Sequence, residues 1–394
     1  MNETIYMPVG EVCSSISDTY REKKNMVTLI NTSDVLEGRV LNHERVPNSN
    51  LKGQFKKTFQ RDDILYSEIR PQNRRFAYVD FSPIDYIAST KLMVIRAKKD
   101  VVSPKYLYYF LKNSSTVAEL QLLAETRSGT FPQITFSEVA NLTIPVPPLA
   151  VQEVIVQTMQ CLEDKTICNE QINDNLEQQA QAIYHERFET VSPNDLPSDW
   201  RTVTLGEVAT ISNKSFNPLK EPEILLEHYS IPAFDEARFP VFELSTSIKS
   251  NKFIIDASCF MISKLNPTTK RVWKPYCLTG NAVCSTEFIV YKAKDQSITD
   301  FLYSVIDSGS FSDFMCSHVT GSTGSRQRTT PSDTLSYELI LPSEDELAKF
   351  QSLVSPMYAQ IRINAIENDR LKRLRDSLLP KLMSGEIDVS TIQL

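Results

Sequence analysis

The sequence predicts an α+β protein made of two repeated α/β modules and two long antiparallel helices. Short segments rich in β-branched and aromatic residues are separated by Pro, Asn and Gly, which is typical of strands joined by turns. Apolar residues recur every seven positions from about residue 149 to 188, and the same pattern returns near the C-terminus. Because both features occur twice in the same order, we expect a pseudo-twofold internal symmetry.

The internal repeat is visible as matched segments at a constant spacing. Residues 9–12 (VGEV) match residues 205–208 (LGEV), and residues 64–71 match residues 260–267, in both cases at an offset of 196. After the loss of one residue in the second copy, Gly129 corresponds to Gly324, at an offset of 195. Each half therefore consists of a strand-rich module, an exit segment marked by proline, and a long helix.

Within each module we expect matched strands followed by one short helix. The predicted strands are Ile64–Ile69, Leu92–Ile95, Phe260–Leu265 and Phe288–Tyr291, and the predicted helices are Pro104–Lys112 and Thr299–Asp307. The predicted domains are a first module at 1–147, a helix at 148–190, a second module at 191–342 and a final helix at 343–394.

The two long helices are predicted to pack on each other along a seam interrupted by asparagines. A buried Asn costs stability but sets the register, because a shifted pairing leaves its amide without a partner. A pair of separate amphipathic surface helices is the alternative. The predicted seam is Ile155, Leu162, Asn169, Asn173, Leu176 and Ile183 on the first helix, and Phe350, Met357, Asn364, Asn368, Leu371 and Leu378 on the second.

Composition excludes several classes of protein. The 394 residues have the apolar and charged fractions of an ordinary globular protein. No stretch approaches the roughly 18 apolar residues of a membrane span, and the N-terminus lacks the pattern of a signal peptide, so we expect a cytoplasmic protein. Seven cysteines without CxxC pairs and four isolated histidines indicate neither a disulfide framework nor a metal site. Cys161 and Cys168, seven apart on the first helix, are expected to be small buried hydrophobes.

The net charge of −7 is unevenly distributed. Residues 148–200 hold ten acidic and two basic side chains, whereas residues 1–147 hold 16 acidic and 19 basic ones. Since carboxylates are repelled by phosphate, we expect the first helix to face solvent or a basic protein rather than nucleic acid.

Catalytic motifs are missing from the sequence. It contains no GxxxxGK phosphate loop, no GxGxxG after a strand and no Asn-Pro-Pro-Tyr-like adenine pocket. What differs between the two copies is the loops, including residues 72–75 and 268–271. A repeated scaffold with divergent loops is suited to presenting two recognition surfaces.

The exit segments carry a resemblance to a known family. Residues 128–134 (SGTFPQI), followed by residues 144–149 (IPVPPL) and Gln152, resemble the specificity subunits of type I restriction-modification systems. Residues 324–328 (GSRQR) and 382–387 (LMSGEI) are similar to the C-terminal half of that family. The second exit departs from the pattern because Pro342 is followed by Ser and Glu rather than by a second proline.

The resemblance implies a non-catalytic chain. Two target-recognition domains would each read one half of a bipartite site in double-stranded DNA. The two helices would form a coiled-coil spacer that docks two methyltransferase (modification) subunits. Restriction/translocase subunits complete such complexes, and S-adenosylmethionine, ATP and Mg are expected in the partner subunits, with no cofactor and no metal in this chain.

Candidates for DNA contact lie at the loop tips and in the exit segments. Arginine can bind guanine through two hydrogen bonds or hold phosphate, lysine favours phosphate, and glutamine can read adenine. The candidates are Arg70, Arg74, Arg75, Arg127 and Gln133 in the first half, and Lys264, Lys270, Arg271, Arg326, Gln327 and Arg328 in the second.

Three other functions remain as alternatives. A stand-alone DNA-binding regulator with two modules would bind its site tightly without partners, which nearly neutral modules disfavour. A protein-only adaptor would have no use for divergent basic loop tips. An enzyme with an unfamiliar site is the third and weakest alternative.

Overall fold

The computed structural model describes residues 4–22, 24–49, 53–127, 131–192, 195–221, 223–320 and 327–389. Contacts divide the chain into two compact units. The first unit comprises residues 1–165 and 370–394, and the second comprises residues 166–369. Each unit therefore takes one part of both long helices.

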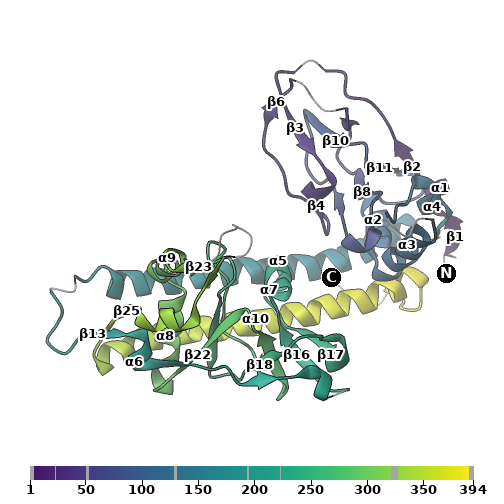
Figure 1. The fold of residues 1–394 in the computed structure, drawn as a ribbon. Helices are drawn as coiled ribbons and strands as arrows, with labels where there is room; N and C mark the ends of the chain where they lie inside the picture. Colours follow the sequence, from purple (N-terminus) through teal and green to yellow (C-terminus); the bar gives the residue numbers. More distant parts are fainter. Residues whose placement is uncertain are drawn as a thin grey trace. The chain divides into compact units, whose positions relative to one another are not determined.

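The first unit contains two four-stranded sheets (Figure 1). One has the strand order β2-β11-β8-β9, and all its neighbours are antiparallel. The other has the order β6-β3-β10-β7, in which β3 and β10 run parallel. The strands are β2 (Cys13–Ile16), β3 (Met26–Ile30), β6 (Val46–Pro47), β7 (Phe55–Lys57), β8 (Ile64–Ser67), β9 (Phe76–Tyr78), β10 (Tyr86–Ser89) and β11 (Leu92–Ala97).

Short elements complete this unit. The remaining strands form two pairs, β1 with β12 and β4 with β5. These elements are β1 (Ile5–Pro8), β4 (Val35–Leu36), β5 (Arg39–Val40), β12 (Thr143–Val146), α1 (Val9–Val12), α2 (Pro104–Lys112), α3 (Ser114–Arg127), α4 (Phe136–Asn141), and the 3₁₀ turns η1 (Thr32–Asp34) and η2 (Pro71–Asn73).

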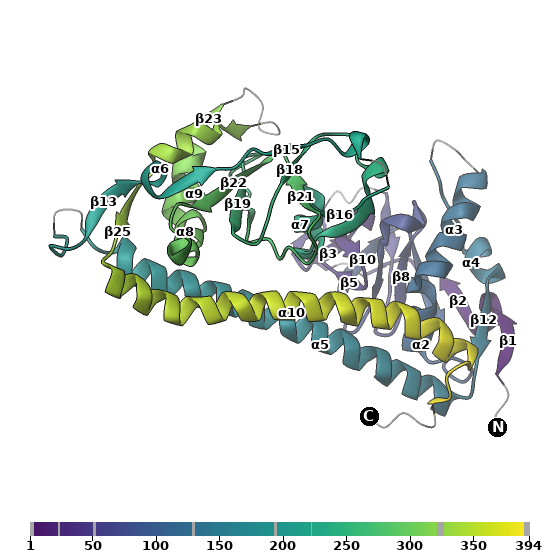
Figure 2. The same cartoon turned by 90° about the horizontal axis from the view of Figure 1, so that it is seen from below.

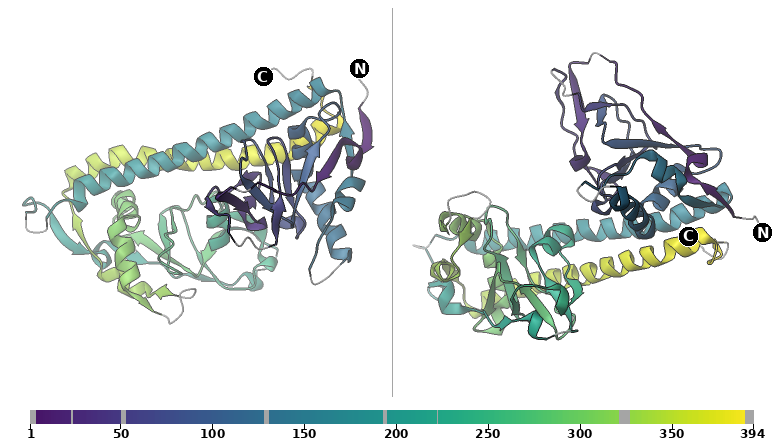
Figure 3. Two further views of the ribbon diagram at one scale, coloured as in Figure 1. Left: turned by 90° about the horizontal axis from the view of Figure 1, so that it is seen from above. Right: turned by 45° about the vertical axis from the view of Figure 1, so that its right-hand side comes forward.

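The second unit repeats this plan (Figure 3, green). Its two larger sheets have the orders β14-β22-β19-β20 and β15-β18-β21-β16-β17, in which β16 pairs in parallel with β21, and the pairs β13-β25 and β23-β24 form smaller sheets. The strands are β13 (Arg201–Thr204), β14 (Ala209–Ile211), β15 (Ser215–Phe216), β16 (Leu225–Tyr229), β17 (Val241–Leu244), β18 (Lys252–Ile254), β19 (Cys259–Ser263), β20 (Val272–Trp273), β21 (Ala282–Ser285), β22 (Phe288–Ala293), β23 (Val319–Thr320), β24 (Arg328–Thr329) and β25 (Glu338–Leu341).

The helices of the second unit are α6 (Leu205–Val208), α7 (Ile231–Ala237), α8 (Thr299–Ile306) and α9 (Gly309–Ser317), with 3₁₀ turns η4 (Pro218–Lys220), η5 (Ser245–Ser247), η6 (Gln296–Ile298) and η7 (Pro331–Ser336). Three of them, α6, α8 and α9, correspond to α1, α2 and α3 of the first unit, while α7 is additional and the 3₁₀ turn η7 takes the place of α4. The predicted α+β class and the predicted repeat are thus confirmed. The predicted helix at 299–307 ends at Ile306.

Each module packs on both long helices, α5 (Leu149–Tyr184) and α10 (Glu344–Ser384). In the first unit Ile155 of α5 and Leu382 of α10 share one core with Tyr106 of α2. In the second unit Tyr184 of α5 and Phe350 of α10 pack around Phe301 of α8. Burial of such large apolar side chains contributes about 1.5–3 kcal/mol each, so these cores attach the modules to the helices.

Asparagines join the two helices in the second unit. Asn169 donates to Asn368 at 2.8 Å, and Asn364 donates to Asn173 at 2.8 Å. Asn169 also donates to Glu367 at 2.8 Å. Because the residue number falls on one helix as it rises on the other, α5 and α10 are antiparallel, as Figure 2 shows.

The predicted seam positions differ in burial. Ile155, Asn169, Phe350 and Asn364 are buried, while Leu162, Asn173, Leu176, Ile183, Met357, Asn368, Leu371 and Leu378 are half-buried. The expectation for Cys161 and Cys168 is wrong, since both thiols are exposed. A small side chain fits an exposed helix face as well as a buried one, so its presence carries no information about burial. Beyond Tyr184 the chain continues as a π-helical turn, His185–Glu189 (η3).

Candidate nucleic-acid interface

The two modules share one backbone frame where the central sheet meets the exit segment. In the first module β8 ends, Ile69 bridges to Gln133, and the Arg70 amide donates to the Pro132 carbonyl at 3.1 Å. In the second module Leu265 bridges to Arg328 in the same way. The exit segments are therefore held against the strand ends by matched hydrogen bonds.

A left-handed residue follows each of these strands. Arg70 has φ of 44° and Asn266 has φ of 48°. Such values are uncommon outside glycine, and their recurrence at positions 196 apart shows that the turn is part of the repeated design. The serine hydroxyls just before, at Ser67 and Ser263, accept from the amides of Ile69 and Leu265 and brace the turn.

The first-module arginines predicted to bind DNA lie in different environments. Arg70 is exposed. Arg74 donates to Ser114 at 2.9 Å and lies 3.8 Å from a carboxylate oxygen of Glu37. Arg75 donates to the Ser33 carbonyl at 3.0 Å. Arg70 is thus accessible to solvent, whereas Arg74 and Arg75 hold neighbouring loops together.

In the second module two of the predicted residues are likewise engaged internally. Lys270 lies 2.8 Å from Asp307, and Arg271 binds Asp235 through two hydrogen bonds of 2.6 and 2.9 Å. Only 14% of the Arg271 side chain is exposed. Lys264 is half-buried, and its amide donates to the Glu287 carbonyl at 2.9 Å.

The exit residues Gln133 and Arg328 occupy equivalent places and bind equivalent partners. Lys91 donates to the Gln133 side-chain oxygen at 3.3 Å and lies 3.4 Å from Glu68. Arg328 donates from Nε and Nη2 to Glu287 at 3.0 and 3.1 Å. These hydrogen bonds with Glu287 raise the pKa of Arg328 above its ordinary value.

The partners of these exit residues were not among the predicted site residues. Glu68 and Lys91 of the first module stand where Lys264 and Glu287 stand in the second, so the charges are inverted at both positions. The constant offset of 196 is a sequence signal that is sufficient to find this inversion. Of the remaining predicted residues, Gln327 is half-buried and its carbonyl accepts from Asn266 at 2.9 Å. The Arg127 side chain and Arg326 lie outside the described residues.

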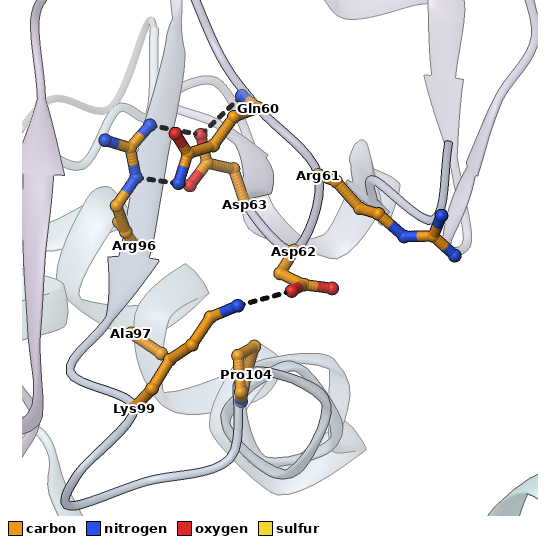
Figure 4. Close-up of a pocket in the computed structure, with 8 residues that line it drawn as sticks. All are labelled: Gln60, Arg61, Asp62, Asp63, Arg96, Ala97, Lys99 and Pro104. Carbon is orange, nitrogen blue, oxygen red and sulfur yellow. Dashed lines mark hydrogen bonds and ion pairs between the residues drawn. The ribbon is translucent and has the colours of Figure 1, made fainter. Parts of the chain in front are cut away.

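A small charged pocket lies beside the first module's central sheet (Figure 4). It has a volume of about 240 Å³. Arg96 donates to the buried Asp63 through two hydrogen bonds of 2.7 Å, and Lys99 pairs with Asp62 at 2.6 Å. The side chain of Arg61 points away from the pocket. Two of its three cations, Arg96 and Lys99, are thus paired with its two carboxylates, so the lining as a whole keeps one positive charge, that of Arg61.

The second module varies the same cluster. Lys292 replaces Arg96 and pairs with Asp256 at 2.5 Å, and Cys259 stands in place of Asp63. Burial works against the ionised form of Asp256, but hydrogen bonds from Lys292 and Ser258 outweigh it and lower its pKa to about 2. Burial raises the pKa of the Cys259 thiol to about 11, so this cysteine stays protonated. Both modules therefore have an ion pair at this place, but its carboxylate comes from a different position of the repeat in each module.

Polar side chains also fasten each module to the helices. In the first unit Glu163 of α5 accepts from Tyr109 at 2.9 Å and pairs with Lys112. In the second unit the corresponding hydroxyls of Ser304 and Tyr358 are 2.7 Å apart. The same place in the repeat therefore carries an ion pair in one unit and a neutral hydrogen bond in the other.

The described residues contain no cluster of three or more His, Cys, Asp or Glu placed to hold a metal ion. In the same ranges no helix combines the length and the apolarity that a membrane span needs. The two modules share one backbone frame and carry different side chains on it. This arrangement is typical of the class of binding proteins that recognise two different targets.

The comparisons with known proteins specify that class. Residues 6–178 match the family described as type I restriction modification DNA specificity domain. The chain is 29% identical to the type I restriction enzyme HindI specificity subunit of Haemophilus influenzae, over 92% of this chain and 94% of the relative. It is 25% identical to the type I restriction enzyme MjaIX specificity subunit of Methanocaldococcus jannaschii, over 79% and 77% of the two chains.

The fold agrees with a solved structure. The S subunit of the type I restriction-modification system from M. genitalium has a TM-score of 0.54 and 16% identity, covering 97% of this chain and 96% of that one. Over most of its length the chain is thus similar to type I restriction enzyme specificity subunits, and residues 6–178 match their DNA specificity domain.

Proposed function

We propose that the chain gives a type I restriction-modification complex its DNA sequence specificity, with each module reading one half of an asymmetric bipartite site. The observation that carries the proposal is the shared frame at Ile69–Gln133 and Leu265–Arg328, which presents different side chains in the two modules. Reading two different half-sites with one backbone frame needs different side chains in the two modules, because each base pair presents its own pattern of donors and acceptors. The two half-sites are proposed to lie about one helical turn apart, roughly 34 Å.

The proposed DNA contacts follow the position of the side chains relative to the shared frame. Arg70, Lys264, Gln133 and Arg328 are proposed to touch DNA directly, and Arg127, Arg326 and Gln327 to do so from the adjoining exit segments. Arg74, Arg75, Lys270 and Arg271 are proposed to order the loops that carry these contacts, because each is held by a partner outside the shared frame.

The helices are proposed to separate the half-sites and to dock two methyltransferase subunits. The ten acidic side chains in residues 148–200 disfavour contact with phosphate and favour a protein surface instead. The recognition domains are proposed at 1–147 and 191–342, and the spacers at 148–190 and 343–394. S-adenosylmethionine, ATP and Mg would be bound by partner subunits, and restriction/translocase subunits would complete the assembly in the cytoplasm.

Mapping methylated adenines tests the proposal. The full chain would be co-expressed with its modification subunit in a host lacking other adenine methylation, and the genome read by single-molecule sequencing. We expect one asymmetric motif with two parts and a fixed gap. Unchanged methylation despite a stable complex of the two proteins would instead support a protein-only adaptor, and tight site-specific binding by the isolated chain would support a stand-alone regulator.

A further inference from the structure

The Arg328 guanidinium is held in one orientation by Glu287. Its Nε and Nη2 atoms donate to the two carboxylate oxygens at 3.0 and 3.1 Å. A guanidinium is planar and has five N–H groups, so this contact uses one long edge. One N–H of Nη1 and the second N–H of Nη2 form another pair of parallel donors, directed roughly 120° away from the edge that binds Glu287.

Arg328 is more exposed than comparable arginines of this chain. The Arg328 side chain is 43% exposed, against 30% for Arg96 and 14% for Arg271, two other arginines that are each held by two hydrogen bonds to one carboxylate. The residue also lies on the exit segment that bridges to Leu265. An exposed, pre-oriented pair of donors matches the two acceptors, O6 and N7, that guanine presents in the major groove.

The equivalent position in the first module has different chemistry on the same backbone. Gln133 stands at the place of Arg328, and its side-chain oxygen accepts from Lys91 at 3.3 Å. Within the described part of the chain the amide N–H₂ of Gln133 has no acceptor, and its oxygen can accept a second hydrogen bond. This combination fits the donor and acceptor pattern of adenine in the major groove.

We propose that Arg328, oriented by Glu287, reads a guanine in the second half-site, and that Gln133, oriented by Lys91, reads an adenine at the corresponding position of the first. The inference rests on the proposed function and deepens it, since it names the bases at one position of each half. Glu287 and Lys91 are positioning residues, because they act through the side chains that they hold.

The local charge agrees with this assignment. Lys264 and Arg328 flank Glu287 in the second module, so the three side chains carry one net positive charge. Lys91 and Glu68 cancel in the first module, where the reading group is neutral. Exposed ion pairs of this kind contribute little to folding, about 0–1 kcal/mol, so stability alone gives no reason to keep a linked set at both positions.

Substitution in the full complex tests the assignment. Methylation rates of the complex with Arg328→Gln would be compared on duplexes in which each guanine of the second half-site is replaced by adenine or by 7-deazaguanine, which lacks the N7 acceptor. We expect loss of roughly 5- to 100-fold discrimination at one position, with the other positions unchanged. Glu287→Gln should weaken discrimination at the same position by a smaller factor.

Lys292→Gln is the matched control, because it also removes an exposed ion pair from the second module but away from the exit segment. It should leave the motif unchanged. A second half-site without any G·C pair, or equal loss on all duplexes with Arg328→Gln, would overturn the assignment while leaving the proposed function intact. If the unaltered complex methylated no bipartite motif, both would fail.

A transplant gives the converse test. Glu68→Lys, Lys91→Glu and Gln133→Arg together place the second module's charged set on the first module's frame. The combined variant should change one adenine of the first half-site to guanine in the methylated motif. A variant that forms the complex and still methylates the original first half-site would contradict the proposed reading of both exit residues.

Discussion

Replacing Glu163 by alanine tests how the first module is fastened to α5. The Glu163 carboxylate pairs with Lys112 and accepts from Tyr109 at 2.9 Å, and Arg375 of α10 lies 3.9 Å away. Only 10% of the Lys112 side chain is exposed, and burial lowers the pKa of this lysine. Removing the carboxylate therefore leaves a nearly buried ammonium group without its counter-ion.

The magnitude follows from the burial of the pair. Breaking a buried ion pair on one side costs about 3–5 kcal/mol. Because 26% of the Glu163 side chain is exposed, solvent screening reduces this to about 2–3 kcal/mol. For a unit of this size each kcal/mol lowers Tm by about 2–4 °C, so Glu163→Ala should lower the Tm of the first unit by roughly 5–10 °C.

Thermal and denaturant unfolding of the full chain, with hydrogen exchange in α2 to assign the transition, would measure the effect. The double variant Glu163→Ala, Lys112→Met should recover part of the loss, since no unpaired charge remains. Glu153→Ala is the control, because Glu153 is exposed on the same helix. A cost below about 0.5 kcal/mol for Glu163→Ala, or strictly additive effects in the double variant, would refute the reasoning.

Three further predictions concern other features. The folded pKa of Asp256 is about 2 against an ordinary 3.8, so its ionised carboxylate stabilises the fold above pH 4, and this stabilisation is lost as pH falls through 2. Because 57% of the side chain is exposed, the contribution amounts to about 1 kcal/mol. Acid titration of unfolding should show the loss in the parent protein but not in Asp256→Asn. Gly38→Ala should cost about 2 kcal/mol in denaturant unfolding, because φ is +107° and a Cβ would lie 2.2 Å from the Tyr108 hydroxyl, whereas Gly53→Ala, with open space around it, should stay within about 0.5 kcal/mol. Asn364→Ala should cost about 1–2 kcal/mol by the same assay, since it leaves the inter-helix amide contact unmade, and an unchanged midpoint would contradict the role given to the asparagine pairs.

The repeat and the strand-rich modules could be predicted from the sequence because their signals are local. The segments at 64–71 and 260–267 keep their apolar positions in register, and their structures are matching strands β8 and β19. Asparagines at the same helical positions likewise indicated an inter-helix contact, since only a matched polar partner makes a buried amide tolerable.

The state of individual charged side chains could not be predicted, because their partners are distant in sequence. Arg271 binds Asp235, and Arg75 binds the Ser33 carbonyl, across loops that share few identities between the copies. The exposure of Cys161 could not be predicted either, because a small side chain fits both a helix seam and an exposed helix face. The compact units also divide α5 and α10 partway along, which no change in composition marks.

Exchanging residues 1–147 for the equivalent segment of another family member tests the central claim most directly. The hybrid would be co-expressed with the same modification subunit and its methylated motif read across the genome. If each module reads its own half-site, one half of the motif changes and the other half, with the gap, stays the same. A change in both halves, or in neither, would contradict modular reading of the DNA.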